Sequence, residues 1–211
     1  MKKKTRNILL SILIGAFLLC AIVGGTVYYY LFAPQFHPSK TVYVYIDRDD
    51  TTDSIYNKIR QTGHVNQFTG FLWMAKYKKL NQNIHTGRYA IRPNDNVYHV
   101  FSRLSRGYQE PINLTIGSVR TLDRLARSVG KQLMIDSAEI ARHLFDSTFQ
   151  AEMGYTPITM ACLFIPETYQ VYWDMSADDF FKRMQTEHQR FWNDERLARA
   201  TAIGMTPEEV C

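Results

Sequence analysis

The chain opens with a long stretch that carries no charge. The uncharged run covers residues 7–35, and its apolar core lies at residues 8–32. About 20 apolar residues suffice to cross a bilayer, so this run can span one with some tilt. Four basic residues precede it, namely Lys2, Lys3, Lys4 and Arg6. By the positive-inside rule they predict a cytoplasmic N-terminus, a single-pass anchor within residues 1–33, and export of the remaining chain.

The end of this run supports an anchor more than a cleaved signal peptide. Its aromatic residues suit the far membrane interface, where such side chains concentrate: Tyr28, Tyr29, Tyr30 and Phe32. The apolar region of a signal peptide is shorter, roughly 7–15 residues, and ends at small residues. Gly24 and Gly25 are small, so cleavage remains the alternative. Cys20 follows two leucines rather than a small residue, which argues against a lipoprotein site.

Beyond the anchor, strand and helix periodicities alternate. After a connector at residues 34–40, β-forming side chains at residues 41–46 predict a strand. An N-cap signal and the pair Ile55 and Ile59 predict a helix that ends near Gly63, and a second apolar stripe predicts a helix over residues 66–79. A strand at residues 88–92 completes a β-α-α-β unit.

The remaining pattern continues as a mixed fold. Apolar spacing predicts helices near residues 97–107, 121–130 and 137–145, and a strand at residues 112–116. A capping box at Ser176 begins a longer helix whose inward stripe comprises Phe180, Phe181, Met184 and Phe191. The sequence therefore predicts an α+β fold with two lobes, residues 34–116 and 117–211, that meet near Gly117.

Charge and cysteine usage narrow the function classes. The formal net charge is +5, of which the four basic residues before residue 7 supply +4. The rest carries 21 basic against 20 acidic residues, with no basic stripe for nucleic acid. The three cysteines do not form a disulfide framework, and Cys162 fits a small buried hydrophobe. The six histidines lack paired metal-ligand spacing, so we expect neither a metal site nor a cofactor.

One segment combines a carboxylate with aromatic rings. Pro166 restricts its own backbone and that of Ile165, so we expect an apolar strand to stop there and Glu167 to face a cleft. The hydroxyls of Thr168 and Tyr169 are close enough in sequence to bond the carboxylate. The aromatic residues Tyr169, Tyr172 and Trp173 would then form the floor. Carbohydrate sites pair aromatic faces with carboxylates in this way, while an ordinary turn beside core aromatics is the competing interpretation.

Three short motifs resemble one enzyme family. Residues 165–169, Ile-Pro-Glu-Thr-Tyr, resemble the F-P-(E/D)-T-Y segment of the endolytic murein transglycosylases, the MltG or YceG-like family. Gly87-Arg88-Tyr89 is similar to the family's G-x-Y strand, and residues 104–107 to its L-x-x-G helix end. The resemblance covers most of residues 41–211 and includes an anchor in the expected place. The chain departs at Ala161-Cys162, where members carry Glu-Gly, and at residues 117–119, where they carry Pro-Glu-Gly.

The resemblance implies an activity and a set of partners. Members cleave the β-1,4 bond between N-acetylmuramic acid and N-acetylglucosamine in peptidoglycan to leave 1,6-anhydro ends, which terminates nascent glycan strands. The β-α-α-β unit would be a LysM-like glycan-binding lobe, and residues 117–211 the front of the catalytic lobe. Substrate-binding residues would be Glu167, Thr168, Tyr169 and Tyr172. Partners would be peptidoglycan glycan strands, the inner membrane and cell-wall synthases, with the bulk of the chain periplasmic.

The resemblance implies that the catalytic acid lies outside residues 1–211. Residues 206–209, Thr-Pro-Glu-Glu, form a helix-start signal followed only by Val210 and Cys211. In the family this helix leads to the catalytic Glu, which we therefore expect beyond Cys211, with residues 1–211 an N-terminal fragment. The alternative is a non-catalytic, membrane-anchored protein that binds the cell wall or acts in division.

Overall fold

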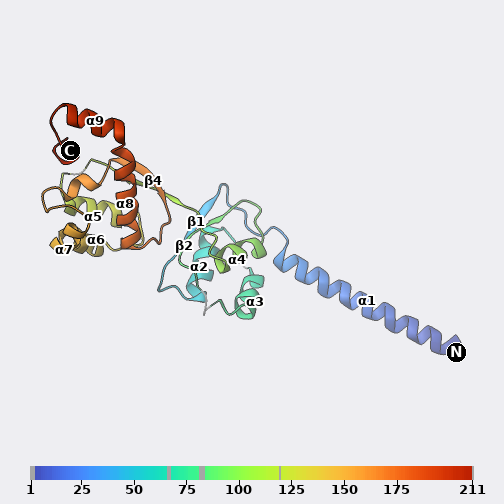
Figure 1. The fold of residues 1–211 in the computed structure, drawn as a ribbon. Helices are drawn as coiled ribbons and strands as arrows, with labels where there is room; N and C mark the ends of the chain where they lie inside the picture. The colour runs from blue at the N-terminus through green and yellow to red at the C-terminus, as the bar shows by residue number, and fades with distance from the viewer. Residues whose placement is uncertain (1–2, 66–67, 81–83, 119, 211) are drawn as a thin grey trace. The chain divides into compact units, whose positions relative to one another are not determined.

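The computed structural model describes residues 3–65, 68–80, 84–118 and 120–210. It divides the chain into two compact units, Met1–Gln109 and Glu110–Cys211, which are described separately below. Both units mix helices with a two-stranded sheet, so the predicted α+β class is confirmed (Figure 1).

The first unit contains the long N-terminal helix and a β-α-α-β body. Its elements are α1 (Lys3–Leu31), β1 (Val42–Ile46), α2 (Thr52–Thr62), α3 (Thr69–Tyr77), β2 (Gly87–Ile91) and α4 (Val97–Ser105). Strands β1 and β2 pair antiparallel, with Val42 opposite Ile91 and Ile46 opposite Gly87. The predicted element order is confirmed, because β1, α2, α3 and β2 follow one another as the periodicity indicated.

Local signals explain the helices of this body. Thr51 and Ser54 form a reciprocal capping box at the start of α2, and Asn96 caps α4 by accepting from the His99 N–H at 2.8 Å. Ile55 and Ile59 then point from α2 into a core that also takes the inward residues of α3 and α4. The core includes Phe36, Phe68, Phe71, Tyr89 and Phe101.

The second unit places helices around a strand pair. Its elements are β3 (Ile112–Ile116), α5 (Leu122–Gly130), α6 (Ser137–Phe145), α7 (Ser147–Glu152), the 3₁₀ helix η2 (Met160–Leu163), β4 (Glu167–Val171), α8 (Ala177–Phe191), α9 (Asp194–Ala202) and α10 (Pro207–Val210). Strands β3 and β4 pair antiparallel, with Ile112 opposite Val171 and Ile116 opposite Glu167. Their inward residues pack against Phe180, Phe181 and Met184 of α8.

Two expectations about chain organisation are wrong. The boundary lies between Gln109 and Glu110 rather than near Gly117, because residues 112–116 pair with β4 and so belong to the second unit. The apolar residues before Pro166 form η2, whereas a strand that stops at Pro166 was expected. Strand β4 begins at Glu167.

Helix α1 is the one helix, among the residues that the structure describes, long and apolar enough to cross a membrane. The qualifying span is Asn7–Leu31, 25 residues with a mean hydropathy of 2.7. The most apolar stretch of this span is not buried inside the protein, whereas Leu31 at its end packs against the core of the first unit.

Candidate functional site

The second unit contains a cavity of about 810 Å³. The segments that line it include the end of β3, the bend from η2 to β4, the junction of α8 with α9, the end of α9, and α10. They contribute Gly117 and Ser118, Cys162, Ile165 and Pro166, and Phe191, Trp192, Arg196 and Arg199. We call this cavity the groove.

One wall of the groove follows from a helix break. Asn193 caps α9 by accepting from the Arg196 N–H at 3.1 Å, so α8 ends at Phe191 and Trp192 lies in the elbow. The rings of Phe191 and Trp192 meet edge to face at 5.5 Å. The Arg196 guanidinium lies 4.1 Å from the centre of the Phe191 ring and donates to the Phe191 carbonyl at 2.6 Å. This wall therefore combines aromatic surface with a fixed cation.

The opposite wall is the bend at Ile165 and Pro166, and the Tyr169 side chain is hydrogen-bonded to this bend. The Tyr169 hydroxyl donates to the Ile165 carbonyl at 2.7 Å, and the side chain is only 5% exposed. Burial raises the pKa of Tyr169 to about 12, with the carboxylates of Glu187 and Glu167 adding to the effect, so the phenol stays a donor. Tyr169 was expected to contact substrate; the structure places its ring in the core of the second unit, with the hydroxyl bonded to the Ile165 carbonyl.

Glu167 and Thr168 lie at the groove end of β4, and both are exposed. Glu167 pairs with Ile116, the residue before Gly117, and directly follows Pro166, so it stands at the rim. Its Oε1 accepts from the Thr168 N–H at 2.9 Å. The expected bonds from the hydroxyls of Thr168 and Tyr169 are not made. The Thr168 hydroxyl instead lies 3.1 Å from that of Thr115.

Tyr172 lies apart from the other predicted residues. It lies five positions after Glu167, which along a strand is about 16 Å. It is 53% exposed and lines a different hollow of about 650 Å³ together with Gln170, Asp174 and Arg183. Trp173 is half-buried and packs against the core of the unit. The predicted aromatic floor is therefore not formed, and of the predicted residues Glu167 lies nearest in sequence to the groove, directly after Pro166.

The sequence interpretation missed the α8–α9 wall. Phe191 was expected to point inward with Phe180, Phe181 and Met184; those three are buried, but Phe191 is half-buried and lines the groove. The missed signal is Asn193 followed by Asp194 and Glu195, an N-cap with acidic residues in the first helical turn. It marks a second helix start directly after Trp192.

Two further side chains of the second unit are notable, Cys162 and His188. Cys162 is half-exposed on the groove wall rather than buried, with Sγ 3.8 Å from the Glu208 carbonyl oxygen. His188 packs against the Tyr155 ring at 5.9 Å, and its Nε2 is buried without a hydrogen-bond partner. Burial lowers the pKa of His188, while the Glu208 carboxylate opposes that shift.

Over residues 3–65, 68–80, 84–118 and 120–210, no three His, Cys, Asp or Glu side chains gather in a way that could hold a metal ion.

Comparison with known proteins agrees with the motifs. The model of the YceG-like family matches residues 44–211. No curated protein matches the chain. Among solved structures, the 2.6 Å crystal structure of a yceG-like protein from Listeria monocytogenes matches at 20% sequence identity with a TM-score of 0.46. The match covers 81% of this chain and 61% of that one. Since the family model matches most of the chain, the protein belongs to the YceG-like family.

Proposed function

We propose that the protein is a membrane-anchored component of peptidoglycan processing whose groove binds glycan strands for endolytic transglycosylation. The observation that carries this proposal is the groove itself, in a chain of the YceG-like family. Its walls offer the aromatic faces of Phe191 and Trp192 to sugar rings, and its rim offers the Glu167 carboxylate to hydroxyl groups. Arg196 and Arg199 supply cations for the carboxylates that peptide-bearing muramic acid carries.

The proposed reaction breaks the muramic-acid β-1,4 bond without water. One carboxylic acid protonates the leaving glycosidic oxygen, and its conjugate base then takes the proton of the muramic C6 hydroxyl as that oxygen bonds to C1. The proton balance closes on a single group, which acts first as acid and then as base. We assign this group to none of residues 1–211. The role of this chain in the reaction is to bind and orient the strand.

Glu167 suits binding better than proton donation. It is exposed, and its Oε1 accepts from the Thr168 N–H at 2.9 Å. A carboxyl group that acts as general acid typically lies in an apolar pocket shielded from water, and the exposed Glu167 has no such surroundings. We therefore give Glu167 the task of accepting hydrogen bonds from sugar hydroxyls.

The assignment of the groove as the glycan site can be tested by measuring the glycan affinity of the whole chain in lipid nanodiscs. Trp192→Ala removes the aromatic face and should weaken binding about tenfold, which corresponds to about 1.4 kcal/mol. Glu167→Gln keeps the acceptor for the Thr168 N–H and should weaken binding less, with folding unchanged. The matched control is Tyr172→Ala, which truncates an exposed aromatic residue in the other hollow.

Each outcome of that experiment decides the assignment. Unchanged binding for Tyr172→Ala with a loss for Trp192→Ala supports the groove. The reverse pattern moves the site to the hollow at Tyr172, and equal binding by all variants leaves glycan recognition to the first unit, as in an anchored wall-binding protein. Incubation of residues 1–211 with glycan strands should release no 1,6-anhydro ends, and their detection would refute the placement of the catalytic acid.

A further inference from the structure

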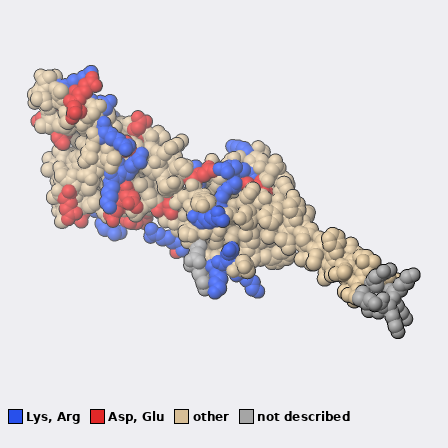
Figure 2. All heavy atoms as spheres, turned by 45° about the vertical axis from the view of Figure 1, so that its right-hand side comes forward, with Lys and Arg blue, Asp and Glu red and all other residues tan. Residues whose placement is uncertain are grey.

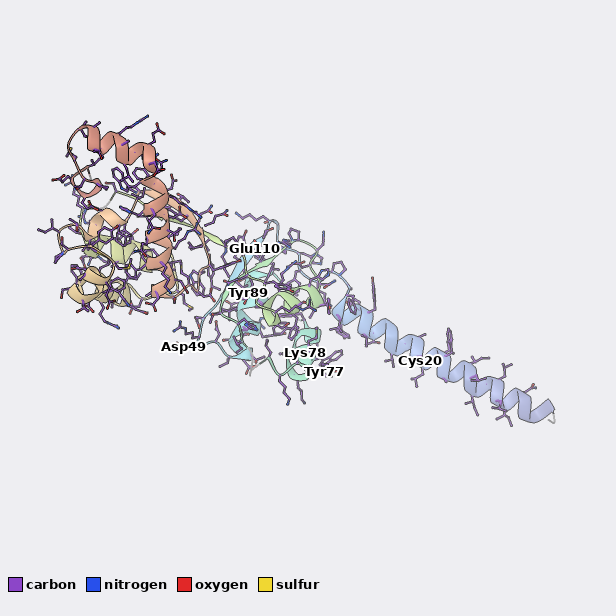
Figure 3. All side chains as sticks on the ribbon, in the orientation of Figure 1. Cys20, Asp49, Tyr77, Lys78, Tyr89 and Glu110 are labelled. Atoms are coloured by element: carbon purple, nitrogen blue, oxygen red, sulfur yellow. The ribbon has the colours of Figure 1, made fainter. Side chains whose placement is uncertain are left out.

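The first unit carries exposed aromatic and basic side chains on the face next to α1. Helix α3 buries Phe71 and Ala75, yet its other side is also apolar. Trp73 is 49% exposed and Tyr77 82% exposed, and Tyr77 and Lys78 project from the end of the helix (Figure 3). We call the exposed set the basal face: Leu72, Trp73, Lys76, Tyr77, Lys78 and, from α4, Tyr98.

The basal face is joined directly to the end of α1. The Trp73 ring meets the Tyr30 ring at 5.3 Å, and the Tyr98 ring meets Phe32 at 5.3 Å. Gly70 of α3 lies so close that a Cβ there would stand 2.3 Å from the Tyr30 carbonyl oxygen. These contacts hold α3 beside the last turn of α1, as its position next to the C-terminal end of that helix illustrates (Figure 1).

Helix length sets the depth of this junction. The 25-residue span Asn7–Leu31 is about 37 Å long, whereas the hydrocarbon core of a bilayer is about 30 Å thick. The excess places the last turn of α1, with Tyr28 and Tyr30, in the headgroup layer, where Tyr and Trp side chains concentrate. Trp73 contacts Tyr30 and therefore lies at the same depth.

Charge favours the same arrangement. Residues 34–109 hold 11 Lys and Arg against 5 Asp and Glu, a net +6, whereas residues 110–211 hold 10 against 15, a net −5. From residue 54 to residue 109 the only acidic side chain is Asp95, against nine basic ones. The face of the first unit drawn in Figure 2 is correspondingly rich in blue Lys and Arg atoms. The near-neutral sum over residues 34–211, which is +1, thus combines a basic first unit with an acidic second unit.

A polar hollow adjoins the basal face. It has a volume of about 410 Å³ and is lined by Lys78 and Tyr98 of that face together with His85, Ser102 and Arg106. Two cations beside a hydroxyl and an imidazole are groups that bind a phosphate oxygen. The hollow is therefore placed and charged to receive the phosphate of a lipid that stands next to α1.

We propose that the first unit rests its basal face on the headgroup layer of an anionic bilayer, with Trp73 and Tyr77 in the interface and a lipid phosphate in the hollow at Lys78 and Arg106. The inference depends on α1 spanning the membrane, which is part of the proposed function. A body attached in this way has a fixed height above the bilayer, because α3 and α1 enter the same layer.

Trp73 can report the contact in the full chain. The chain has three tryptophans, so Trp173→Phe with Trp192→Phe leaves Trp73 as the only one. In nanodiscs of phosphatidylglycerol with brominated acyl chains we expect its fluorescence to be quenched and its emission shifted to the blue. Lys76→Gln with Lys78→Gln should reduce that quenching to the level found in neutral phosphatidylcholine discs. The matched control is Lys131→Gln with Lys182→Gln in the second unit, which should change nothing.

A second reporter separates this inference from the anchor. Phe17→Trp, with the other three tryptophans replaced by Phe, places the fluorophore in the middle of α1. If that reporter is quenched and Trp73 is not, the anchor stands and the docked face is refuted. If neither is quenched, both are refuted. If Trp73 is quenched to the same extent in anionic and neutral discs, and with or without Lys76→Gln and Lys78→Gln, the anionic contact is refuted.

Discussion

His188 shows how one buried atom can make stability depend on pH. It lies on α8 with Nε2 buried and without a hydrogen-bond partner, and burial lowers its pKa below the ordinary 6.5. The folded state therefore resists protonation of this ring, whereas the unfolded chain accepts a proton as the pH falls through 6.5. Because the unfolded state binds more protons in that range, the free energy of unfolding falls as the pH is lowered.

We expect His188→Gln to remove part of this acid sensitivity. The variant should lose less melting temperature than the parent between pH 7.5 and pH 5, as measured by thermal unfolding in the same detergent. The control is His37→Gln, which alters an exposed histidine of the first unit and should leave the slope unchanged. Parallel slopes for parent and His188→Gln would show that the buried ring does not govern the acid response.

The residues of β4 show how much of the site the sequence could predict. Strand periodicity places alternate residues on one face, so Tyr169 and Val171 share the buried side while Thr168 and Gln170 face outward. The burial of Tyr169 could have been inferred from that rule once the strand was known to begin at Glu167. What the pattern could not supply is the groove, since its walls come from residues about 75 positions apart along the chain, from Gly117 to Trp192.

At the scale of elements, local signals were sufficient where a helix is capped and amphipathic. Helices α2 and α8 were predicted from their caps and stripes, and α4 from its stripe alone. The four-residue η2 was mistaken for a strand because so short an apolar run fits either period. The unit boundary was misplaced because the pairing of β3 with β4 joins residues 112 and 171, and no local pattern encodes such a partner.

The ion pair between Arg103 of α4 and Asp95 of the preceding turn is expected to stabilise the folded first unit. Asp95 is 6% exposed and accepts from both terminal nitrogens of Arg103, one of them at 3.0 Å, while also accepting from the Arg92 N–H at 2.7 Å. Arg103→Ala leaves that buried carboxylate without its cation, which should cost about 3–5 kcal/mol. Trp73 fluorescence in the single-tryptophan background can follow the unfolding of this unit.

An exposed ion pair provides the matched control for this prediction. Asp123 and Arg127 pair across one turn of α5 with both side chains more than half exposed. Arg127→Ala should cost less than about 1 kcal/mol, because solvent screens such pairs and solvates the remaining carboxylate. Similar losses for the two Arg→Ala variants would mean that burial does not set the cost.

At the scale of the whole molecule, the two net charges raise the question of which side of the membrane the body occupies. The basic first unit would favour the cytoplasmic side if the positive-inside rule counted every Lys and Arg of the chain. The rule counts charges in short flanks near the span, and folded domains translocate largely regardless of their charge. Before the span stand Lys2, Lys3, Lys4 and Arg6, whereas the exported flank through residue 50 carries Lys40 and Arg48 against three aspartates. The flanks therefore favour an exported body.

We accordingly expect alkaline phosphatase fused after Gln109, at the boundary of the units, to be active, and a cytoplasmic reporter at the same position to be silent. Replacing Lys2, Lys3, Lys4 and Arg6 with Gln should lower the phosphatase activity, because it removes the bias that orients α1. A matched set of four Lys→Gln changes in the first unit, at Lys58, Lys76, Lys78 and Lys79, should leave the orientation intact. A soluble product whose N-terminus lies near Thr26 would instead identify the apolar run as a signal peptide, and would remove the anchor on which the docked basal face depends.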